Sequence, residues 1–108
     1  MPLDTSSFGR AIASARKELG ISQKELASKI IKEEGDAITP QYLNDIEHDK
    51  RTPSSDHLVR QFATELKISP DILYWLAGRV PGDIAKSGVS PEKISQAFTA
   101  FRRALKGK

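Results

Sequence analysis

The sequence predicts an all-α protein of five short helices, a linker and a C-terminal helix. Apolar residues recur at steps of three and four along most of the chain, which is the period of a helix with one buried face. No stretch alternates between apolar and polar residues as a half-buried strand does. Hydroxyl residues, prolines and glycines divide the apolar series at short intervals, as helix caps do. We therefore expect a helical domain over residues 1–79, followed by a linker and an amphipathic helix over residues 80–108.

Three helices are expected in the first half of the chain, over residues 8–19, 22–30 and 39–48. Ser22 and Glu25 stand at the spacing of a capping box, in which the serine oxygen accepts a backbone N–H and the glutamate reaches back. Thr39-Pro40 places a capping hydroxyl before a proline at the first helical position. Gly20 supplies a left-handed residue at which the first helix can end. The expected buried stripes are Phe8, Ala11, Ile12, Ala15 and Leu19, then Leu26, Ala27 and Ile30, then Leu43 and Ile46.

Three further helices are expected in the second half, over residues 54–66, 69–78 and 91–105. Pro53-Ser54 offers a cap for the first of them, and Ser69-Pro70 and Ser90-Pro91 repeat the hydroxyl–proline pattern. Gly78 is placed to end the fifth helix of the domain. The expected stripes are Leu58, Phe62, Ala63 and Leu66, then Ile72, Leu73 and Leu76, then Ile94, Phe98, Phe101 and Leu105.

Length and composition narrow the classes of function. The 108 residues make one domain with a short appendage, and no cysteine is present, which excludes disulfides, thiol catalysis and thiolate metal sites. No apolar run reaches the roughly 20 residues of a membrane span, and the first four residues do not open a signal peptide, so we expect a cytoplasmic protein with no membrane partner. The net charge of +3 permits a polyanionic partner without identifying one.

No catalytic or cofactor site is expected. His48 and His57 lie on different predicted helices, and the sequence has no serine-nucleophile motif, no HExxH motif and no glycine-rich phosphate loop. Asp45, His48 and Asp49 stand at a spacing that suits a metal ion, but a polar recognition helix and its cap explain the same residues. The sequence therefore predicts a binding protein that is not an enzyme and that needs no metal and no cofactor.

The predicted helix over residues 39–48 has two contrasting faces. Leu43 and Ile46 face the core, while the opposite face carries Gln41, Asn44, Asp45 and His48. Glutamine and asparagine amides can bind adenine through two hydrogen bonds, and aspartate can accept one from the cytosine amino group. A short helix with such faces suits reading of the DNA major groove, although a merely solvated face has the same composition.

Three motifs occur in order around this helix: Gln23-x-x-Leu26-Ala27, Thr39-x-x-x-Leu43-x-x-Ile46-Glu47, and Lys50-Arg51-Thr52-Pro53. In these motifs the chain resembles the phage-repressor (XRE, lambda-repressor-like) helix-turn-helix family, over residues 8–78. The resemblance implies a five-helix lambda-repressor-like domain that binds double-stranded DNA. It implies a sequence-specific transcription regulator, most often a repressor, that acts as a homodimer on a two-fold-related operator.

The resemblance also implies a role for each matching position. The base-reading residues would be Pro40, Gln41, Asn44 and Asp45. The phosphate-contacting residues would be Gln23, Lys24, Lys29, His48, Lys50, Arg51 and Thr52. Arg16 and Glu47 would form a structural pair that joins the first helix to the recognition helix and fixes its orientation.

The chain departs from the family pattern in three places. Residues 32–38 lengthen the link before the recognition helix, so that either the second helix runs on through Ile31 or a loop bulges out. The acidic residues of this link, Glu33, Glu34 and Asp36, would be repelled by phosphate, and we expect the loop to point away from DNA. Asp49 replaces the usual helix-ending glycine, which aspartate can imitate in the left-handed region. Pro40 occupies a slot that often reads a base, where its ring can touch only a thymine methyl group.

The sequence leaves open which surface buries the apolar stripe of the terminal helix. Its stripe must be buried either against its own domain or against a second subunit. A partner protein is a third occupant if the chain is an interaction module, such as an antitoxin that binds a toxin. Arg102, Arg103, Lys106 and Lys108 form a basic end that we interpret as a solvated face.

Overall fold

The computed structural model describes residues 3–107 and is all-helical over that range, which confirms the predicted fold class. Residues 3–107 contain no strand, only one isolated bridge between Ile31 and Ala37. None of the helices in this range is both long and apolar enough to cross a membrane. The helices are α1 (Phe8–Glu18), α2 (Gln23–Lys29), α3 (Pro40–Glu47), α4 (Asp56–Leu66), α5 (Pro70–Ala77), α6 (Gly82–Ala85) and α7 (Pro91–Lys106).

Most of the predicted helix starts are confirmed, and two need correction. Ser22, Thr39 and Ser90 each accept a backbone N–H from the third residue beyond, at 3.0–3.3 Å. The cap of α4 is Ser55, not Ser54, because the Ser55 hydroxyl is the one that accepts from the Leu58 N–H. Pro70 begins α5 as expected, but the Ser69 side chain makes no capping hydrogen bond.

The helix ends confirm Gly20 and Gly78 in the left-handed region, with φ of 73° and 68°. Asp49 also adopts this conformation, at φ 59°, which confirms the prediction that it imitates the glycine usual at this position in the family. Lys67 ends α4 in the same way, which nothing in its residue type predicts.

The core is enclosed by α1–α5, where the predicted stripes meet. Its largest fully buried side chains include Ile12, Leu26, Leu43, Phe62 and Leu73. The ring of Phe8 meets that of Phe62 edge to face at 6.2 Å, which joins α1 to α4. Two expected core residues, Leu19 and Ile72, are instead exposed, and both line an open surface hollow beside α1 and α5.

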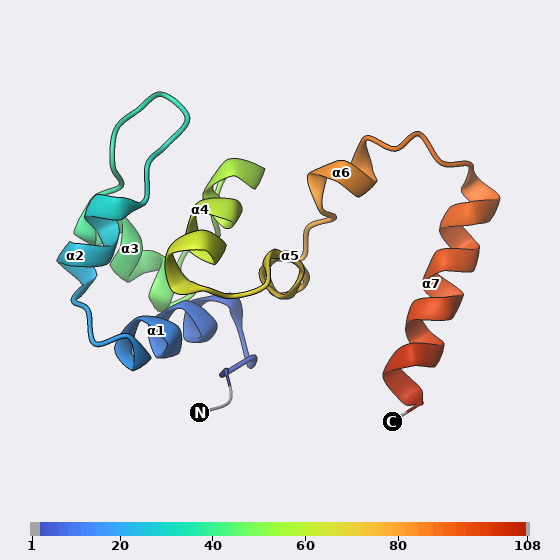
Figure 1. Cartoon of the computed structure of the whole chain (residues 1–108), viewed down its shortest axis with the longest axis horizontal. Helices are drawn as coiled ribbons and strands as arrows, with labels where there is room; N and C mark the ends of the chain where they lie inside the picture. The colour runs from blue at the N-terminus through green and yellow to red at the C-terminus, as the bar shows by residue number, and fades with distance from the viewer. Residues whose placement is uncertain (1–2, 108) are drawn as a thin grey trace.

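The link between α2 and α3 is a loop, since α2 ends at Lys29. The chain turns out and back like a short hairpin, and Figure 1 shows this loop extending well past the helices that flank it. The Lys32 N–H donates to the Asp36 carbonyl at 2.8 Å, and the Ile38 N–H donates to the Ile30 carbonyl at 2.9 Å. Gly35 lies at its tip with φ of 106°, a conformation that side chains oppose. We refer to residues 31–37 as the hairpin.

The hairpin is attached to α4 at its base. The Ile31 N–H donates to the Gln61 side-chain oxygen at 3.0 Å, and the Ile31 carbonyl lies 2.7 Å from Nε2 of His57. A carbonyl oxygen only accepts, so His57 must carry a proton on Nε2. These bonds satisfy both backbone groups of Ile31, while the acidic tip stays in solvent.

The C-terminal part contains one helix more than expected. The four-residue α6 lies in the predicted linker, and α7 stands apart from the five-helix core in Figure 1. The stripe of Ile94, Phe98, Phe101 and Leu105 remains 40–53% exposed. Trp75 of α5 meets Phe101 edge to face at 5.4 Å and is itself 62% exposed. Among residues 3–107, the apolar stripe of α7 is therefore left about half exposed.

Candidate nucleic-acid interface

The outer face of α3 is the accessible part of the recognition motif. Leu43 and Ile46 on the inner face have no exposed surface, which holds the helix firmly on the core. Gln41 and His48 are exposed, and Asn44 and Asp45 are half-buried. The predicted set thus lies together along one side of one short helix, with Pro40 exposed at its first position.

Beneath this face lies the predicted ion pair of Arg16 and Glu47. The guanidinium binds the carboxylate through two hydrogen bonds, from Nε to Oε2 at 2.6 Å and from Nη2 to Oε1 at 3.0 Å. Only 11% of the arginine side chain and 4% of the glutamate side chain are exposed. A third bond, from Nη1 to the Ile21 carbonyl at 2.9 Å, joins the pair to the segment before α2. The pair therefore fixes α1, α2 and α3 relative to one another.

Gln23, the first residue of α2, contacts this pair. Its Nε2 donates to Oε1 of Glu47 at 2.8 Å and to Oδ1 of Asn44 at 3.2 Å. Its side chain is thus turned toward α3, and its backbone N–H lies at the first position of α2.

A second group of contacts covers the other side of the recognition helix. Gln41 donates from Nε2 to Oδ1 of Asp45 at 3.0 Å. Arg51 places Nε 3.7 Å from Oδ2 of Asp45, and its guanidinium carbon lies 4.8 Å from the centre of the Tyr42 ring. Asp45 therefore has partners within the protein for both oxygens. It orients Gln41 and Arg51 on this face as well as facing solvent itself.

His48 has one ring nitrogen in use. Its Nδ1 lies 2.9 Å from the backbone carbonyl of Asn44, so Nδ1 carries a proton. The outer nitrogen, Nε2, is then an acceptor in the neutral ring and can donate to a phosphate only when the ring is protonated.

The other predicted phosphate contacts surround α3 without forming ion pairs among the described residues. Lys24 and Lys29 are exposed on α2, and Lys50 and Thr52 are exposed after α3. Lys50 also donates its backbone N–H to the Asp45 carbonyl at 2.8 Å, which sets the direction of this loop. The structure thus leaves cationic side chains exposed on α2 and in the segment after α3.

One contact that supports the interface was missed from the sequence. The carboxylate of Asp49 accepts from the Ser7 hydroxyl at 2.6 Å and from the Gly9 N–H at 2.9 Å. It therefore closes the N-terminus of α1 against the end of α3, where a negative charge is favourable. An aspartate in the place of a helix-ending glycine was the available signal, but its partners lie about forty residues away.

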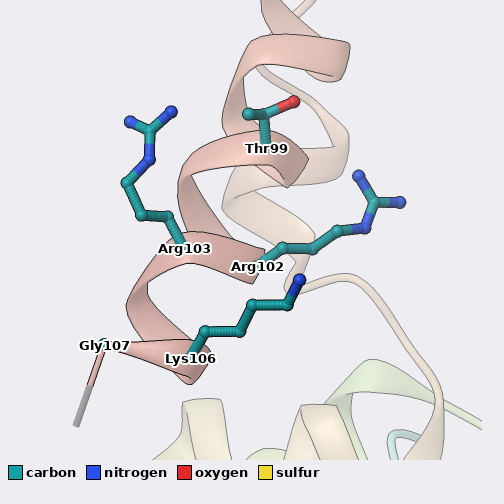
Figure 2. Close-up of a pocket in the computed structure, with 5 residues that line it drawn as sticks. All are labelled: Thr99, Arg102, Arg103, Lys106 and Gly107. Carbon is teal, nitrogen blue, oxygen red and sulfur yellow. The ribbon is translucent and has the colours of Figure 1, made fainter.

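The basic end of α7 does not form a second compact cationic site. Figure 2 shows Arg103 directed to one side of the helix, while Arg102 and Lys106 extend to the other. These side chains and Thr99 line only an open surface hollow. Arg102, Arg103 and Lys106 are exposed and form a solvated basic face, whereas Lys108 lies outside the described residues. The candidate interface remains that of α2 and α3.

Comparisons with known proteins agree with this geometry. A family model described as a helix-turn-helix domain matches residues 9–79, which is well over half of the chain. No curated protein and no solved structure matches the chain significantly. The matched residues run from α1 to just past α5 and include the whole recognition face. The chain therefore belongs to the helix-turn-helix domain family, whose domains bind DNA in transcription regulation.

Proposed function

We propose that the chain is a sequence-specific transcription regulator of the phage-repressor-like type, in which α3 enters the major groove of double-stranded DNA. The observation that carries this proposal is the recognition face itself. Four polar side chains lie outward on a helix whose inner face is fully buried, and the ion pair of Arg16 with Glu47 holds that helix in place. Such a rigid helix can present side chains to base edges at little cost in conformational entropy.

The contacts divide into two groups by chemistry. Gln41, Asn44 and Asp45 read base edges, and the Pro40 ring touches a thymine methyl group. The phosphate contacts come from Gln23, Lys24 and Lys29 on one side, and from His48 and the loop of Lys50, Arg51 and Thr52 on the other. The hairpin points away from the duplex, because its three carboxylates would be repelled by phosphate.

The regulator acts by occupancy and catalyses no reaction. A single domain of this size reads few base pairs, so specificity over a genome calls for two half-sites and a homodimer. The exposed apolar stripe of α7 supports dimer formation, because burying it against a second subunit would remove apolar surface from water. On this basis we propose a cytoplasmic repressor that blocks transcription from a two-fold-related operator.

Selection of bound duplexes from a random library tests this proposal, since it yields the site, its symmetry and its spacing together. On the selected site, Gln41→Ala should weaken binding by about 1–3 kcal/mol and relax the preference at one or two base pairs. Equal losses on the selected site and on random DNA would contradict base reading by Gln41.

Lys50→Ala should behave differently on the same duplexes. It should weaken binding to all of them alike and reduce the slope of log affinity against log salt by about one. Lys86→Ala is the matched control, because Lys86 is also an exposed lysine but lies beyond the five-helix core. If the two lysine variants have the same slope, Lys50 does not contact phosphate.

The exposed α7 stripe also favours a second candidate function, that of an antitoxin-like module that binds a partner protein. The two readings are compatible, since a DNA-binding domain can carry a partner-binding segment. A defined partner that binds the wild-type chain stoichiometrically, but not a Phe98→Asp variant, would favour the module. A purified chain that forms dimers through the same stripe favours the regulator.

A further inference from the structure

The side-chain amide of Asn44 has a defined orientation in this structure. Its hydrogen-bond partners determine which way its nitrogen and its oxygen face. Here the partners form a series that begins at a carboxylate, which can only accept. The series runs from Arg16 through Glu47 and Gln23 to Asn44, and each step determines the next.

The first step is the carboxylate of Glu47. Both of its oxygens accept from the Arg16 guanidinium, and the side chain is almost completely buried. A carboxylate that is paired with arginine in this way is ionised and has no proton to donate. Any further group within hydrogen-bond distance of Oε1 must therefore be a donor.

The second step is Gln23. Its nearest side-chain atom to Glu47 lies 2.8 Å from Oε1, so this atom must be the amide nitrogen Nε2. The same nitrogen lies 3.2 Å from the side chain of Asn44. Because Nε2 only donates, Asn44 must present its oxygen, Oδ1, toward Gln23.

The third step concerns what remains of Asn44. With Oδ1 turned toward α2, its amide nitrogen Nδ2 is directed away from Gln23. No hydrogen bond within residues 3–107 involves Nδ2, although Asn44 lies half-buried on the recognition face. The asparagine thus offers DNA two N–H groups, while its oxygen is turned toward α2, where one of its two lone pairs accepts from Gln23.

We infer that Asn44 reads an acceptor-rich base edge, guanine O6 with N7, and not adenine, and that Gln23 is the positioning residue that makes this choice. This inference rests on the proposed function, in which α3 lies in the major groove. A free asparagine favours adenine because its oxygen accepts from N6 while its nitrogen donates to N7. With the oxygen held by Gln23, the adenine amino group would face another donor, whereas guanine offers two adjacent acceptors.

The experiment compares duplexes that differ at one base pair of the selected site. Asn44→Ala identifies that pair as the position where base preference is lost. The wild-type chain should prefer guanine over adenine there by about 5- to 150-fold. Gln23→Met keeps the length and packing of the side chain but removes the donor, so Asn44 can turn. The guanine-to-adenine ratio should then fall at least about tenfold or invert.

Controls separate this effect from general weakening. Lys24→Ala, one residue along α2, should lower affinity for all the duplexes and leave the ratio unchanged. Thermal melting checks that the Gln23→Met variant is folded, and the ratio of two affinities does not depend on the fraction of folded protein. A merely structural role for Gln23 would change stability without changing this ratio.

The outcomes distinguish this inference from the proposed function. A wild-type preference for adenine beneath Asn44, or an unchanged ratio in Gln23→Met, would overturn the inference while base reading by α3 stands. If Asn44→Ala leaves every base preference intact while Gln41→Ala does not, Asn44 reads no base and the inference also fails. If no substitution on α3 changes any preference, the proposed function fails.

Discussion

At the residue scale, the close approach of α1 to the end of α3 depends on Gly9. A Cβ atom at this position would meet backbone oxygens of α3, including that of Glu47 at 2.8 Å, and the Asp49 carboxylate at 2.7 Å. Backbone oxygens cannot turn aside as a flexible side chain does, so α1 would have to move away. The glycine is therefore required by space, since its own φ is ordinary.

Gly9→Ala should destabilise the domain by about 1–3 kcal/mol, because the added methyl group overpacks a rigid contact. Denaturant unfolding measures this loss. Glu18→Ala, an exposed substitution on the same helix, serves as control and should change stability by less than about 0.5 kcal/mol. A Gly9→Ala chain as stable as the wild type would show that α1 can shift without cost.

The pair of Arg16 and Glu47 allows a second prediction at this scale. Glu47→Ala leaves the Arg16 guanidinium buried without its partner and also removes the acceptor of Gln23. We expect a loss of about 3–5 kcal/mol in the free energy of unfolding. A double-mutant cycle with Arg16→Ala should give a large coupling energy, and a coupling near zero would refute the importance of the pair.

At the scale of elements, Asp56 connects α4 to α5 and to the start of α6. A hydrogen bond from the Tyr74 hydroxyl, the charge of Arg60 and the Gly82 N–H hold the pKa of Asp56 below its ordinary value of 3.8. Burial and the same carboxylate raise the pKa of Tyr74 above 10.0, so that its hydroxyl keeps its proton and donates. The Asp56 carboxylate also lies close to the start of α6, since a Cβ atom at Gly82 would stand 3.1 Å from its Oδ2.

This arrangement predicts a pH dependence. Because the pKa of Asp56 is lower in the folded chain, its contribution to stability is complete above pH 3.8 and is lost as the pH falls through the folded value. Asp56→Asn should therefore be less stable than the wild type at pH 7, and the difference should shrink in acid below pH 3.8. Unfolding of both chains across this range measures it. Asp71→Asn on α5 is the exposed control, and an equal response there would contradict a specific role of Asp56.

At the scale of the whole molecule, α7 lies outside the five-helix core (Figure 1). All its residues are exposed, and the edge contact of Phe101 with Trp75 is the one aromatic contact that joins it to the domain within residues 3–107. A chain without residues 89–108 should therefore keep its thermal stability. It should sediment as a monomer and bind full operators weakly, with its half-site preference intact, because dimerisation raises the effective concentration of the second domain.

Sedimentation and thermal melting of this truncated chain, run side by side with the full chain, separate the two views of α7. A stable monomer from a dimeric parent supports the dimer. Lost stability with no change in oligomeric state would mean that α7 completes the core of its own domain in solution.

The recognition motif was readable from the sequence because its signals are local. Helix periods and caps connect residues three or four apart, so Ser22, Thr39 and Ser90 were identified from their neighbours alone. The outer face of α3 followed from the same period. The family resemblance added the pairing of Arg16 with Glu47, which lie 31 residues apart.

The contacts that orient the interface were decided by the tertiary structure. Asp49 reaches Ser7 across 42 residues, Gln23 reaches Asn44 across 21, and Ile31 reaches Gln61 across 30. Side-chain hydrogen bonds of this kind depend on positions within a few tenths of an ångström, which no residue pattern encodes. The sequence by itself determined an all-α helix-turn-helix domain with its polar face. Only the packing of its helices decided which atoms of that face remain free for DNA.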